Sequence, residues 1–383
     1  MTHNLSAKSE TITASKLNAQ IVNVAVAVIH YQQRYLLGYR HASQHQGDRY
    51  EFVGGKIDAN ETAEAALIRE VFEETAIDIS DNSAIKLGRL HHDYGDKQVC
   101  LHVYRVELSA PQYQQHKDDE FGLEGQALVW VDKASLLANE YDLPAANTTI
   151  LSWLHVPELI TITYSLAHFT TQLDSWEAWL RFHQQNIAKN AWVYVRLKDE
   201  QAERYGALLL QARSDITAIV PIENNNDIKN LDSLNNSRIN SDKSLAHKSL
   251  TQPAAYHLNH GEVLTWFDNL QFSFETSKYL YAKRPLLLSC HDVQSIQAAN
   301  AIAKMRLQHN LPPVIGIFLS PVLATQSHPD TEPLGWKQWS TLAQLADMPV
   351  IALGGLSPAL SHLASSYGAI SIAGIRQFLN GAY

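Results

Sequence analysis

The stretch GGKIDANETAEAALIREVFEETAI, residues 54–77, places six acidic side chains behind a pair of glycines. Asn60 is positioned to cap a helix that starts after it, because an asparagine side chain accepts a hydrogen bond from a free N–H of the first turn. At about 100° per residue, three glutamates of this helix fall within roughly a third of its circumference. They are Glu70, Glu73 and Glu74. Ala65, Ile68 and Phe72 would lie on the far side and pack into a core.

Three carboxylates held so close together repel one another. Without a counter-ion, this repulsion would raise their pKa values. A hard dication such as Mg²⁺ removes the repulsion and prefers carboxylate oxygens as ligands. The alternative is a solvated acidic helix face that has no chemical role.

The spacing of this stretch resembles the signature of the Nudix hydrolases, G-x5-E-x7-R-E-U-x-E-E-x-G-U, in which U is a bulky aliphatic residue. The chain supplies Gly55, Glu61, Arg69, Glu70, Val71, Glu73, Glu74 and Ile77 at that spacing. Ala76 stands where the signature has glycine, and alanine would be strained there if the backbone needs a positive φ. So many matches at fixed spacing favour the cation site over the solvated face.

The resemblance implies a catalytic site and the residues that form it. Mg²⁺, or Mn²⁺ in its place, is expected at a metal site made of Gly54, Glu70, Glu73, Glu74 and Glu124. Glu124 belongs to an EGQ segment that completes the site in the subgroup named below; a plain loop carboxylate is the alternative. Arg69 is expected to brace a glutamate rather than to touch substrate. The general base stays open between Glu70 and Glu124.

Over residues 21–155 the chain looks most like the MutT-type 8-oxo-dGTP diphosphatases. That subgroup reads the oxidised purine with the asparagine of a PAN segment, which here is Asn147; a helix cap is the alternative role. Arg40, His45 and Phe52 fall where the subgroup lines its nucleotide pocket, although the first two could be loop residues and the third plain core. The implied products are a nucleoside monophosphate and pyrophosphate. Hydrolysis of the oxidised triphosphate would keep the oxidised base out of DNA replication and limit the need for DNA repair.

Beyond residue 159 the chain contains eight short apolar runs suited to buried parallel strands, most of them separated by amphipathic helical segments. We therefore expect a two-domain α/β protein: a Nudix α/β/α sandwich with a mixed sheet, followed by a (β/α)8 TIM barrel at 159–383. A doubly wound open sheet is the alternative for the second domain. Residues 223–252 are rich in Asn, Ser and Asp and are expected to be a disordered insertion, with a functional lid as the alternative.

The second domain resembles thiamine phosphate synthase. The resemblance implies a phosphate or diphosphate site formed by Arg196, Lys198, Gly354, Gly355 and Gly374 at the ends of barrel strands. The sequence of the second domain also departs from that family, because glutamates stand where the family usually has two metal-binding aspartates. The departures are Glu223, Glu262, Asn259 in place of glycine, and His328 near the usual lysine. We expect the fold and a phosphate cradle to be kept and the synthase reaction to be lost.

The formal net charge of −9 and the lack of a long apolar stretch indicate neither stable nucleic-acid binding nor a membrane span. Cys100 and Cys290 each lie in an apolar run and are expected to be buried thiols of a cytoplasmic protein. Residues 1–20 are polar and are expected to form a disordered tail. The oligomeric state and the domain arrangement stay open.

Three functions follow from these patterns. The first is a Mg²⁺-dependent hydrolase of oxidised purine triphosphates joined to a phosphate-binding barrel. The second couples the halves, with the first domain hydrolysing thiamine-type diphosphates and the barrel handling a thiamine-precursor phosphate. The third is a sensor in which both domains bind ligands without turnover.

Overall fold

The structure is a computed structural model that describes residues 21–43, 47–95, 97–197, 202–222, 253–272, 283–326 and 331–380. Several predictions from the sequence fall outside these residues. They concern the tail at 1–20, the insertion at 223–252, and the side chains of His45, Lys198, Glu223 and His328.

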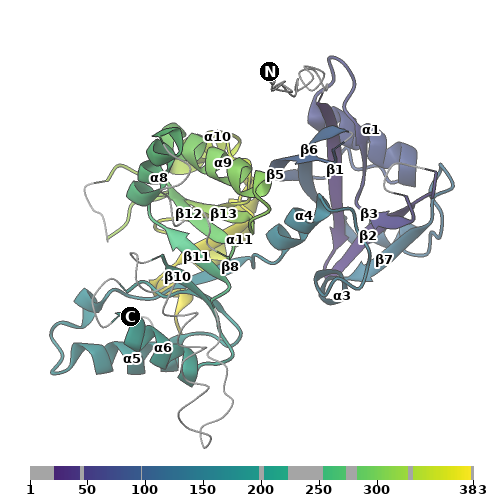
Figure 1. Ribbon diagram of the computed structural model, residues 1–383. Coiled ribbons are helices and arrows are strands. Elements are labelled where there is room, and N and C mark those ends of the chain that lie inside the picture. Colours follow the sequence, from purple (N-terminus) through teal and green to yellow (C-terminus); the bar gives the residue numbers. More distant parts are fainter. Residues whose placement is uncertain are drawn as a thin grey trace, which may run out of the picture.

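The N-terminal domain contains a mixed seven-stranded sheet (Figure 1). Its strands are β1 (Val22–Tyr31), β2 (Arg34–Arg40), β3 (Arg49–Glu51), β4 (Val53–Lys56), β5 (Ala84–Asp93), β6 (Gln98–Glu107) and β7 (Leu128–Asp132). Its helices are α1 (Ala63–Thr75), α2 (Ala110–His116), α3 (Lys133–Leu137) and α4 (Asn147–Leu154). Strand β1 runs parallel to β6 and antiparallel to β2 and β4.

The sheet buries both of its faces, and β1 shows why. Its side chains alternate between the faces, as the period of two of a strand requires. Ala25 and Ala27 pack into the cluster that contains the buried side of α1, whereas Val26 and Val28 pack into the cluster that contains α4. Helices therefore cover both faces, and the expected α/β/α sandwich with a mixed sheet is confirmed.

Helix α1 begins later and buries a different face than the sequence pattern indicated. Its cap is Thr62, whose hydroxyl accepts a hydrogen bond of 3.1 Å from the N–H of Ala65, so the prediction of Asn60 as the cap was wrong. Asn60 instead adopts a left-handed φ of 69° in the preceding turn. The buried residues are Ala66, Leu67, Val71 and Thr75. Because this stripe packs on the sheet, Phe72 is left 51% exposed and Ala65 is exposed as well, so their prediction as core residues was wrong. Ile68 is partly buried and packs against the core, as expected.

The C-terminal domain is a closed barrel of eight parallel strands, one for each apolar run of the sequence. The strands are β8 (Leu159–Ile162), β9 (Trp192–Tyr194), β10 (Thr217–Pro221), β11 (Ala255–Leu258), β12 (Leu286–Cys290), β13 (Val314–Leu319), β14 (Val350–Leu353) and β15 (Ser371–Gly374). Strand β15 pairs with β8 and closes the barrel, which excludes the doubly wound sheet.

Helices surround the barrel and follow its strands. They are α5 (Ser175–Asn186), α6 (Ala202–Ala212), α8 (His260–Phe272), α9 (Val293–Gln308), α10 (Gly335–Ala343) and α11 (Ser361–Ser366), with short 3₁₀ helices η2 (Leu166–Phe169), η5 (Pro358–Leu360) and η6 (Arg376–Phe378). The α/β character of both domains matches the predicted fold class. Cys100 and Cys290 are buried and free, as expected. Within the described residues, no helix combines the length and apolar character needed to cross a membrane.

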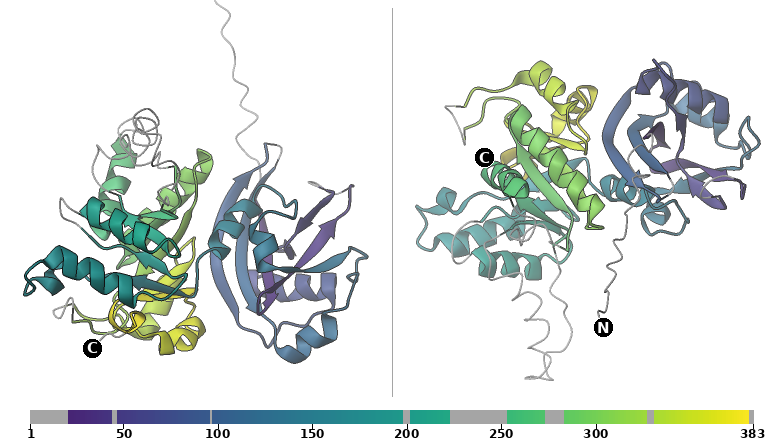
Figure 2. Two further views of the ribbon diagram at one scale, coloured as in Figure 1. Left: turned by 90° about the horizontal axis from the view of Figure 1, so that it is seen from below. Right: turned by 45° about the horizontal axis from the view of Figure 1, so that its top comes forward.

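The two domains pack against each other through β5 and α4 on one side and α9 with the starts of β13 and β14 on the other. The indole N–H of Trp153 donates a hydrogen bond of 3.0 Å to the carbonyl of Val314. Arg89 donates to the carboxylate of Asp347 at 3.0 Å. One apolar cluster runs without a break from the first domain into the barrel. In Figures 1 and 2 the barrel lies beside β5 and α4, while α1 lies on the opposite side of the sheet.

Candidate active site

Two glycines bring the backbone of β4 close to helix α1. A Cβ on Gly54, whose φ is 150°, would lie 2.1 Å from the carbonyl oxygen of Ala25. A Cβ on Gly55 would lie 2.0 Å from a carboxylate oxygen of Glu70. A side chain on Gly54 would clash with the backbone of β1, and a side chain on Gly55 would displace the carboxylate of Glu70. The carboxylate of Glu70 therefore lies directly against bare backbone.

Arg69 connects the glutamates of α1. Its guanidinium donates to Glu61 at 2.9 Å, to Glu70 at 2.8 Å and to Glu73 at 3.0 Å, and also to the carbonyl of Lys56 at 3.1 Å. The planar fork of arginine suits such multiple carboxylate contacts, and a lysine could not reproduce them. Arg69 therefore joins Glu61, Glu70 and Glu73, and its bracing role in catalysis stays a prediction.

Glu74 is the most perturbed carboxylate of the site. Its carboxylate accepts a hydrogen bond of 3.1 Å from the backbone N–H of Gly54. The pKa of Glu74 is raised from 4.5 to about 8. Burial is the largest cause, the Gly54 hydrogen bond opposes it, and the negative charges of Glu51, Glu70 and Glu124 add to it. Glu74 thus sits in an electrostatic field that favours the arrival of positive charge.

The segment that contains Glu124 is fixed to the end of α1. The carbonyl of Glu74 accepts hydrogen bonds from the N–H of Leu123 at 2.9 Å and from the side-chain amide of Gln126 at 3.0 Å. A Cβ on Gly122 would lie 2.0 Å from that same carbonyl oxygen. Glu124 itself is exposed, and its charge acts on Glu74 across the intervening space.

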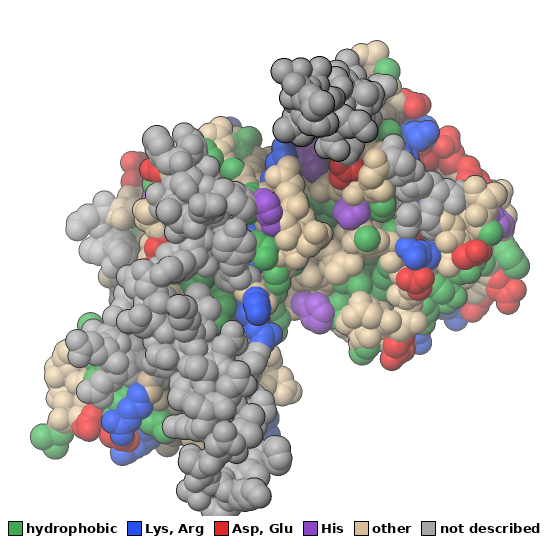
Figure 3. Space-filling view, viewed as in Figure 1, with side chains coloured by type: hydrophobic (Ala, Val, Ile, Leu, Met, Phe, Trp, Pro, Cys, Tyr) green, Lys and Arg blue, Asp and Glu red, His purple; other side chains and the backbone are tan. Residues whose placement is uncertain are grey.

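The donor set fits a hard dication. Glu70, Glu74 and Glu124 offer only carboxylate oxygens, which Mg²⁺ prefers. The pKa of Glu74 is raised chiefly by burial and, to a smaller extent, by the charges of Glu51, Glu70 and Glu124, and a bound cation would offset both effects. Acidic side chains are abundant on the surface over and beside α1 (Figure 3). As the described part of the chain stands, no three His, Cys, Asp or Glu side chains lie close enough together to hold an ion, so binding needs side-chain movement.

Glu51 belongs to this site and was not predicted. It lies on β3, its pKa is raised first by burial, and its charge reaches Glu74. It forms an ion pair with Arg40, which lowers the pKa of Glu51 in turn. In the sequence, Glu51 is one polar residue in the run RYEFVGG and carries no signal of burial. The pairing of β2 with β3 brings Arg40 and Glu51 together.

The two remaining predicted nucleotide-site residues are buried. Phe52 is 3% exposed and lies in the apolar cluster on the α4 side of the sheet. Asn147 is 6% exposed and is the first residue of α4. The cap of α4 is Ala146 and no side chain caps this helix, so the capping role for Asn147 is excluded. Among the described residues, the amide of Asn147 has no hydrogen-bond partner and remains free to recognise a ligand.

Comparison with known proteins identifies the domain that carries this site. The family described as NUDIX domain matches residues 24–153. An 8-oxo-dGTP diphosphatase of Haemophilus influenzae is 32% identical over 137 residues, which cover 35% of this chain and 92% of that protein. The chain belongs to the Nudix hydrolase family. An 8-oxo-dGTP diphosphatase of Escherichia coli is 29% identical over 134 residues, 35% of this chain and 95% of that protein.

Among the described residues, Arg196, Gly354, Gly355 and Gly374 of the predicted phosphate site lie at the carboxyl ends of barrel strands. Gly354 and Gly355 follow β14 with φ values of 108° and 67°. Cβ atoms on them would lie 2.7 Å from Pro321 and 2.6 Å from the carbonyl oxygen of Ala324, so the turn packs on the segment after β13. Arg196 follows β9, and its backbone N–H donates to the hydroxyl of Thr163 at 2.8 Å.

Two other barrel predictions have different structural roles. Gly374 ends β15, and a Cβ there would lie 2.4 Å from the ring of Phe378, so this glycine makes room for a side chain of its own chain. Glu262 accepts a hydrogen bond of 2.7 Å from the N–H of Asn259, while the Asn259 side chain accepts one of 3.1 Å from the N–H of Glu262. This reciprocal pair is a capping box for α8.

The barrel also matches a known family. The family described as Thiamine monophosphate synthase matches residues 279–378. A protein of Aquifex aeolicus named "Putative thiamine-phosphate synthase 2" is 40% identical over 63 residues, which cover 16% of this chain and 34% of that protein. The Nudix domain is therefore fused to a thiamine phosphate synthase-like barrel.

Proposed function

We propose that the Nudix domain is a Mg²⁺-dependent nucleoside triphosphate diphosphatase that converts 8-oxo-dGTP to 8-oxo-dGMP and pyrophosphate. The observation that carries the proposal is the convergence of Glu70 and Glu74 on the two glycines of strand β4, with Arg69 holding Glu70 and Glu73. This domain matches two relatives over nearly their whole length, and both are named 8-oxo-dGTP diphosphatases, which supports the proposed substrate.

Each residue of the site has a defined task in this reaction. Glu70, Glu73, Glu74 and Glu124 would supply the oxygens that hold Mg²⁺, and Mn²⁺ could take its place. When bound, the cation supplies charge neutralisation on the triphosphate and a more acidic attacking water. Arg69 keeps the carboxylates of Glu70 and Glu73 in place. A carboxylate accepts the proton that leaves the water.

The general base is Glu70 or Glu124, and the two differ in their surroundings. Glu70 is held by Arg69 and lies against Gly55, whereas Glu124 is exposed on its loop. Single-turnover rates of Glu70→Gln and Glu124→Gln across pH would separate them. Loss of the base removes the acidic limb of the pH–rate profile, while loss of a ligand alone shifts the Mg²⁺ dependence.

Asn147 is the proposed reader of the oxidised base. A side-chain amide has both a donor and an acceptor, and that of Asn147 is committed to neither a cap nor another described residue. A purine with the wrong edge would leave these buried groups unpaired. A site that hydrogen-bonds its substrate discriminates strongly for this reason.

The proposal is tested by incubating the full chain with Mg²⁺ and a panel of 8-oxo-dGTP, dGTP, CTP and thiamine diphosphate. We expect 8-oxo-dGTP to give the highest kcat/KM, with monophosphate and pyrophosphate as products. Glu73→Gln should lower kcat by roughly 100-fold or more, while the exposed Glu140→Gln should not. Wild-type turnover in Glu73→Gln would end the metal-site argument. Preference for thiamine diphosphate would instead make thiamine-type diphosphates the substrate class. Tight nucleotide binding without hydrolysis would favour a sensor.

For the barrel we propose binding of a phosphorylated ligand at its carboxyl end without the synthase reaction. The Gly354–Gly355 turn supports the phosphate site, because its positive φ values favour glycine and two glycines place no side chain of their own over the backbone N–H groups. The capping box argues against a metal-binding role for Glu262, since its carboxylate already accepts from Asn259. Calorimetry with inorganic pyrophosphate, on wild type and Gly355→Ala, tests this site.

A further inference from the structure

A cavity of about 220 Å³ lies between the two domains, away from both sites described above. Residues of β5, α4, α9 and the starts of β13 and β14 line it. No glutamate of the Nudix signature and no residue of the Gly354–Gly355 turn belongs to its walls. It lies at the amino ends of the barrel strands, opposite to the end where barrel active sites form.

The floor of the cavity is apolar and fixed in place. Leu90, Trp153 and Val314 are each 2% exposed and form part of the continuous cluster between the domains. The hydrogen bond from Trp153 to the Val314 carbonyl holds the indole ring. A cavity of roughly 150 Å³ already accepts benzene. A single small ring with a charged substituent therefore fits the space of this cavity.

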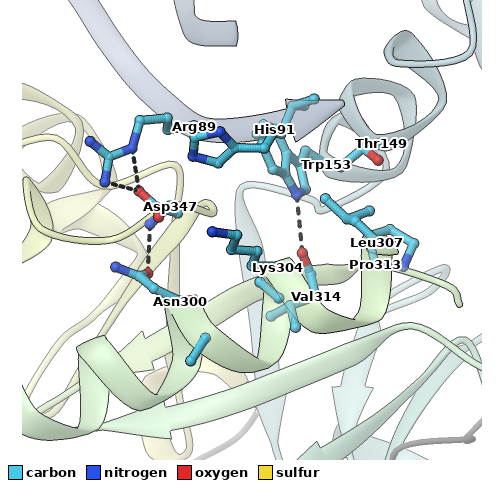
Figure 4. A pocket seen from close by; sticks show the side chains of 13 residues that line it. Arg89, His91, Thr149, Trp153, Asn300, Lys304, Leu307, Pro313, Val314 and Asp347 are labelled. Carbon is cyan, nitrogen blue, oxygen red and sulfur yellow. Dashed lines mark hydrogen bonds and ion pairs between the residues drawn. The ribbon is translucent and has the colours of Figure 1, made fainter. Parts of the chain in front are cut away.

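The rim of the cavity is cationic. Arg89 and Lys304 line it together with His91, whereas Asp347 is the only acidic residue among the lining side chains. Arg89 already pairs with Asp347 at 2.9 Å. Lys304 is exposed, and its ammonium group forms no hydrogen bond or ion pair with any described residue, so it is available to a ligand anion. In Figure 4 the Lys304 side chain extends from α9 into the space between Asp347 and His91.

The side chains of this rim are positioned by both domains. The backbone N–H of Asp347 donates a hydrogen bond of 2.9 Å to the side-chain oxygen of Asn300. The backbone N–H of Arg89 donates one of 3.2 Å to the carbonyl oxygen of Asp347. The pKa of His91 is lowered first by burial and then by the charges of Lys304 and Arg89, which agrees with an electropositive rim.

We propose that this cavity binds a small ring compound that carries a phosphate group. The ring packs on Trp153 and Leu90, and the phosphate meets Lys304, His91 and Arg89. The walls come from both domains, so the bound ligand stabilises their packed arrangement by mass action. The site is distinct from the nucleotide site and from the barrel mouth, and it does not depend on the proposed hydrolase reaction.

The test uses the full chain without Mg²⁺ and phenyl phosphate as the probe, followed by calorimetry and by thermal unfolding. We expect saturable binding of phenyl phosphate to wild type, a raised Tm, and no binding of benzyl alcohol, which keeps the ring but lacks the charge. Lys304→Gln should weaken binding roughly fivefold, the value of one ion pair of about 1 kcal/mol. Lys337→Gln, an exposed lysine of α10, should bind as wild type does.

A second variant tests the need for the space of the cavity independently of the charge of Lys304. Ala303 lines the cavity, and Ala303→Leu fills it without changing any charge. We expect this variant to lose phenyl phosphate binding while its circular dichroism stays that of wild type. Absence of saturable binding to wild type at millimolar concentrations would overturn the proposal. Unchanged affinity in either Lys304→Gln or Ala303→Leu would overturn it equally, because the probe would then bind elsewhere.

Discussion

Trp153 of the Nudix domain donates its indole N–H to the carbonyl of Val314 at the start of barrel strand β13, at 3.0 Å. The indole is 2% exposed and belongs to an apolar cluster shared by both domains. If the domains separated, the buried indole N–H of Trp153 would lose its partner, which costs free energy. The two domains are therefore expected to hold a fixed mutual position, with the glutamate site of the Nudix domain and the carboxyl ends of the barrel strands on separate surfaces.

Gly88 offers a direct test of this interface. A Cβ there would lie 2.7 Å from the carbonyl oxygen of Asp347 and 2.7 Å from the Trp153 ring. Gly88→Ala should destabilise the packed domains by about 1–3 kcal/mol, the usual cost of overpacking. Chemical denaturation and hydrogen exchange of α4 and α9 measure it. Gly206→Ala, where the nearest atom to the added Cβ is 3.7 Å away, is the control, and equal stability of the two variants would contradict the packing.

Ala76 takes the left-handed φ of 62° that the glycine of the Nudix signature would adopt without strain. Its N–H closes α1 by donating to the carbonyl of Phe72 at 2.9 Å. Ala76→Gly should raise the free energy of unfolding by about 1 kcal/mol, because a Cβ in this region costs about that much. Ala138→Gly is the control, since Ala138 ends α3 at a negative φ of −78° and should gain nothing. A loss of stability in Ala76→Gly would show that the strain is not there.

Arg69 should act on catalysis through the glutamates that it holds. Arg69→Lys keeps the charge but cannot bridge Glu61, Glu70 and Glu73 together. We expect kcat/KM for the preferred nucleotide to fall roughly 10- to 100-fold, as for groups that orient metal ligands. The Mg²⁺ concentration for half-maximal activity should rise, which a purely structural role would not produce. Arg34→Lys, at an exposed ion pair with Asp132, is the control.

Asn147 should control the choice between oxidised and normal purine. Asn147→Ala should lower kcat/KM for 8-oxo-dGTP by roughly 100-fold and leave that for dGTP nearly unchanged, because only the oxidised base loses a partner. Thr148→Ala changes the exposed neighbour on α4 and serves as the control. An equal fall for both nucleotides would assign Asn147 a structural role instead.

His183 makes the barrel sensitive to acid. It is fully buried, its Nδ1–H donates to the Trp179 carbonyl at 2.7 Å, and its Nε2 accepts from the N–H of Tyr164 at 3.0 Å. Burial lowers the pKa of His183 from 6.5 to about 4. As the pH falls, the unfolded chain therefore takes up a proton before the folded chain does. The contribution of neutral His183 to the free energy of unfolding is present in full above pH 6.5 and is lost as the pH falls toward 4.

The free energy of unfolding measured between pH 7 and pH 4 should therefore decline by roughly 3 kcal/mol on account of this residue. His183→Gln should show a flatter pH dependence, and the exposed His362→Gln should keep the wild-type slope. Parallel curves for wild type and His183→Gln would rule out the buried neutral imidazole as the cause.

The sequence was most informative where function or folding depends on spacing along the chain. The glutamates of residues 54–77 recur at helical intervals, and the eight apolar runs after residue 159 are strands in the barrel. The sequence was less informative about details that neighbours decide. Thr62 caps α1 in place of Asn60, because the first turn starts two residues later, and Phe72 is exposed, because the stripe from Leu67 to Thr75 faces the sheet.

The chain alone determined the family signature, the eight strand segments of the second domain and the residue types of the nucleotide site, since these follow from local periodicity and fixed spacing. Only the tertiary structure decided that Glu51 adds its charge to Glu74, that Glu262 caps a helix, and that Arg89 and Lys304 share a cavity. The physical reason is distance in sequence: burial and electrostatic coupling depend on which remote segments meet, and Arg89 meets Asp347 across 258 residues of chain.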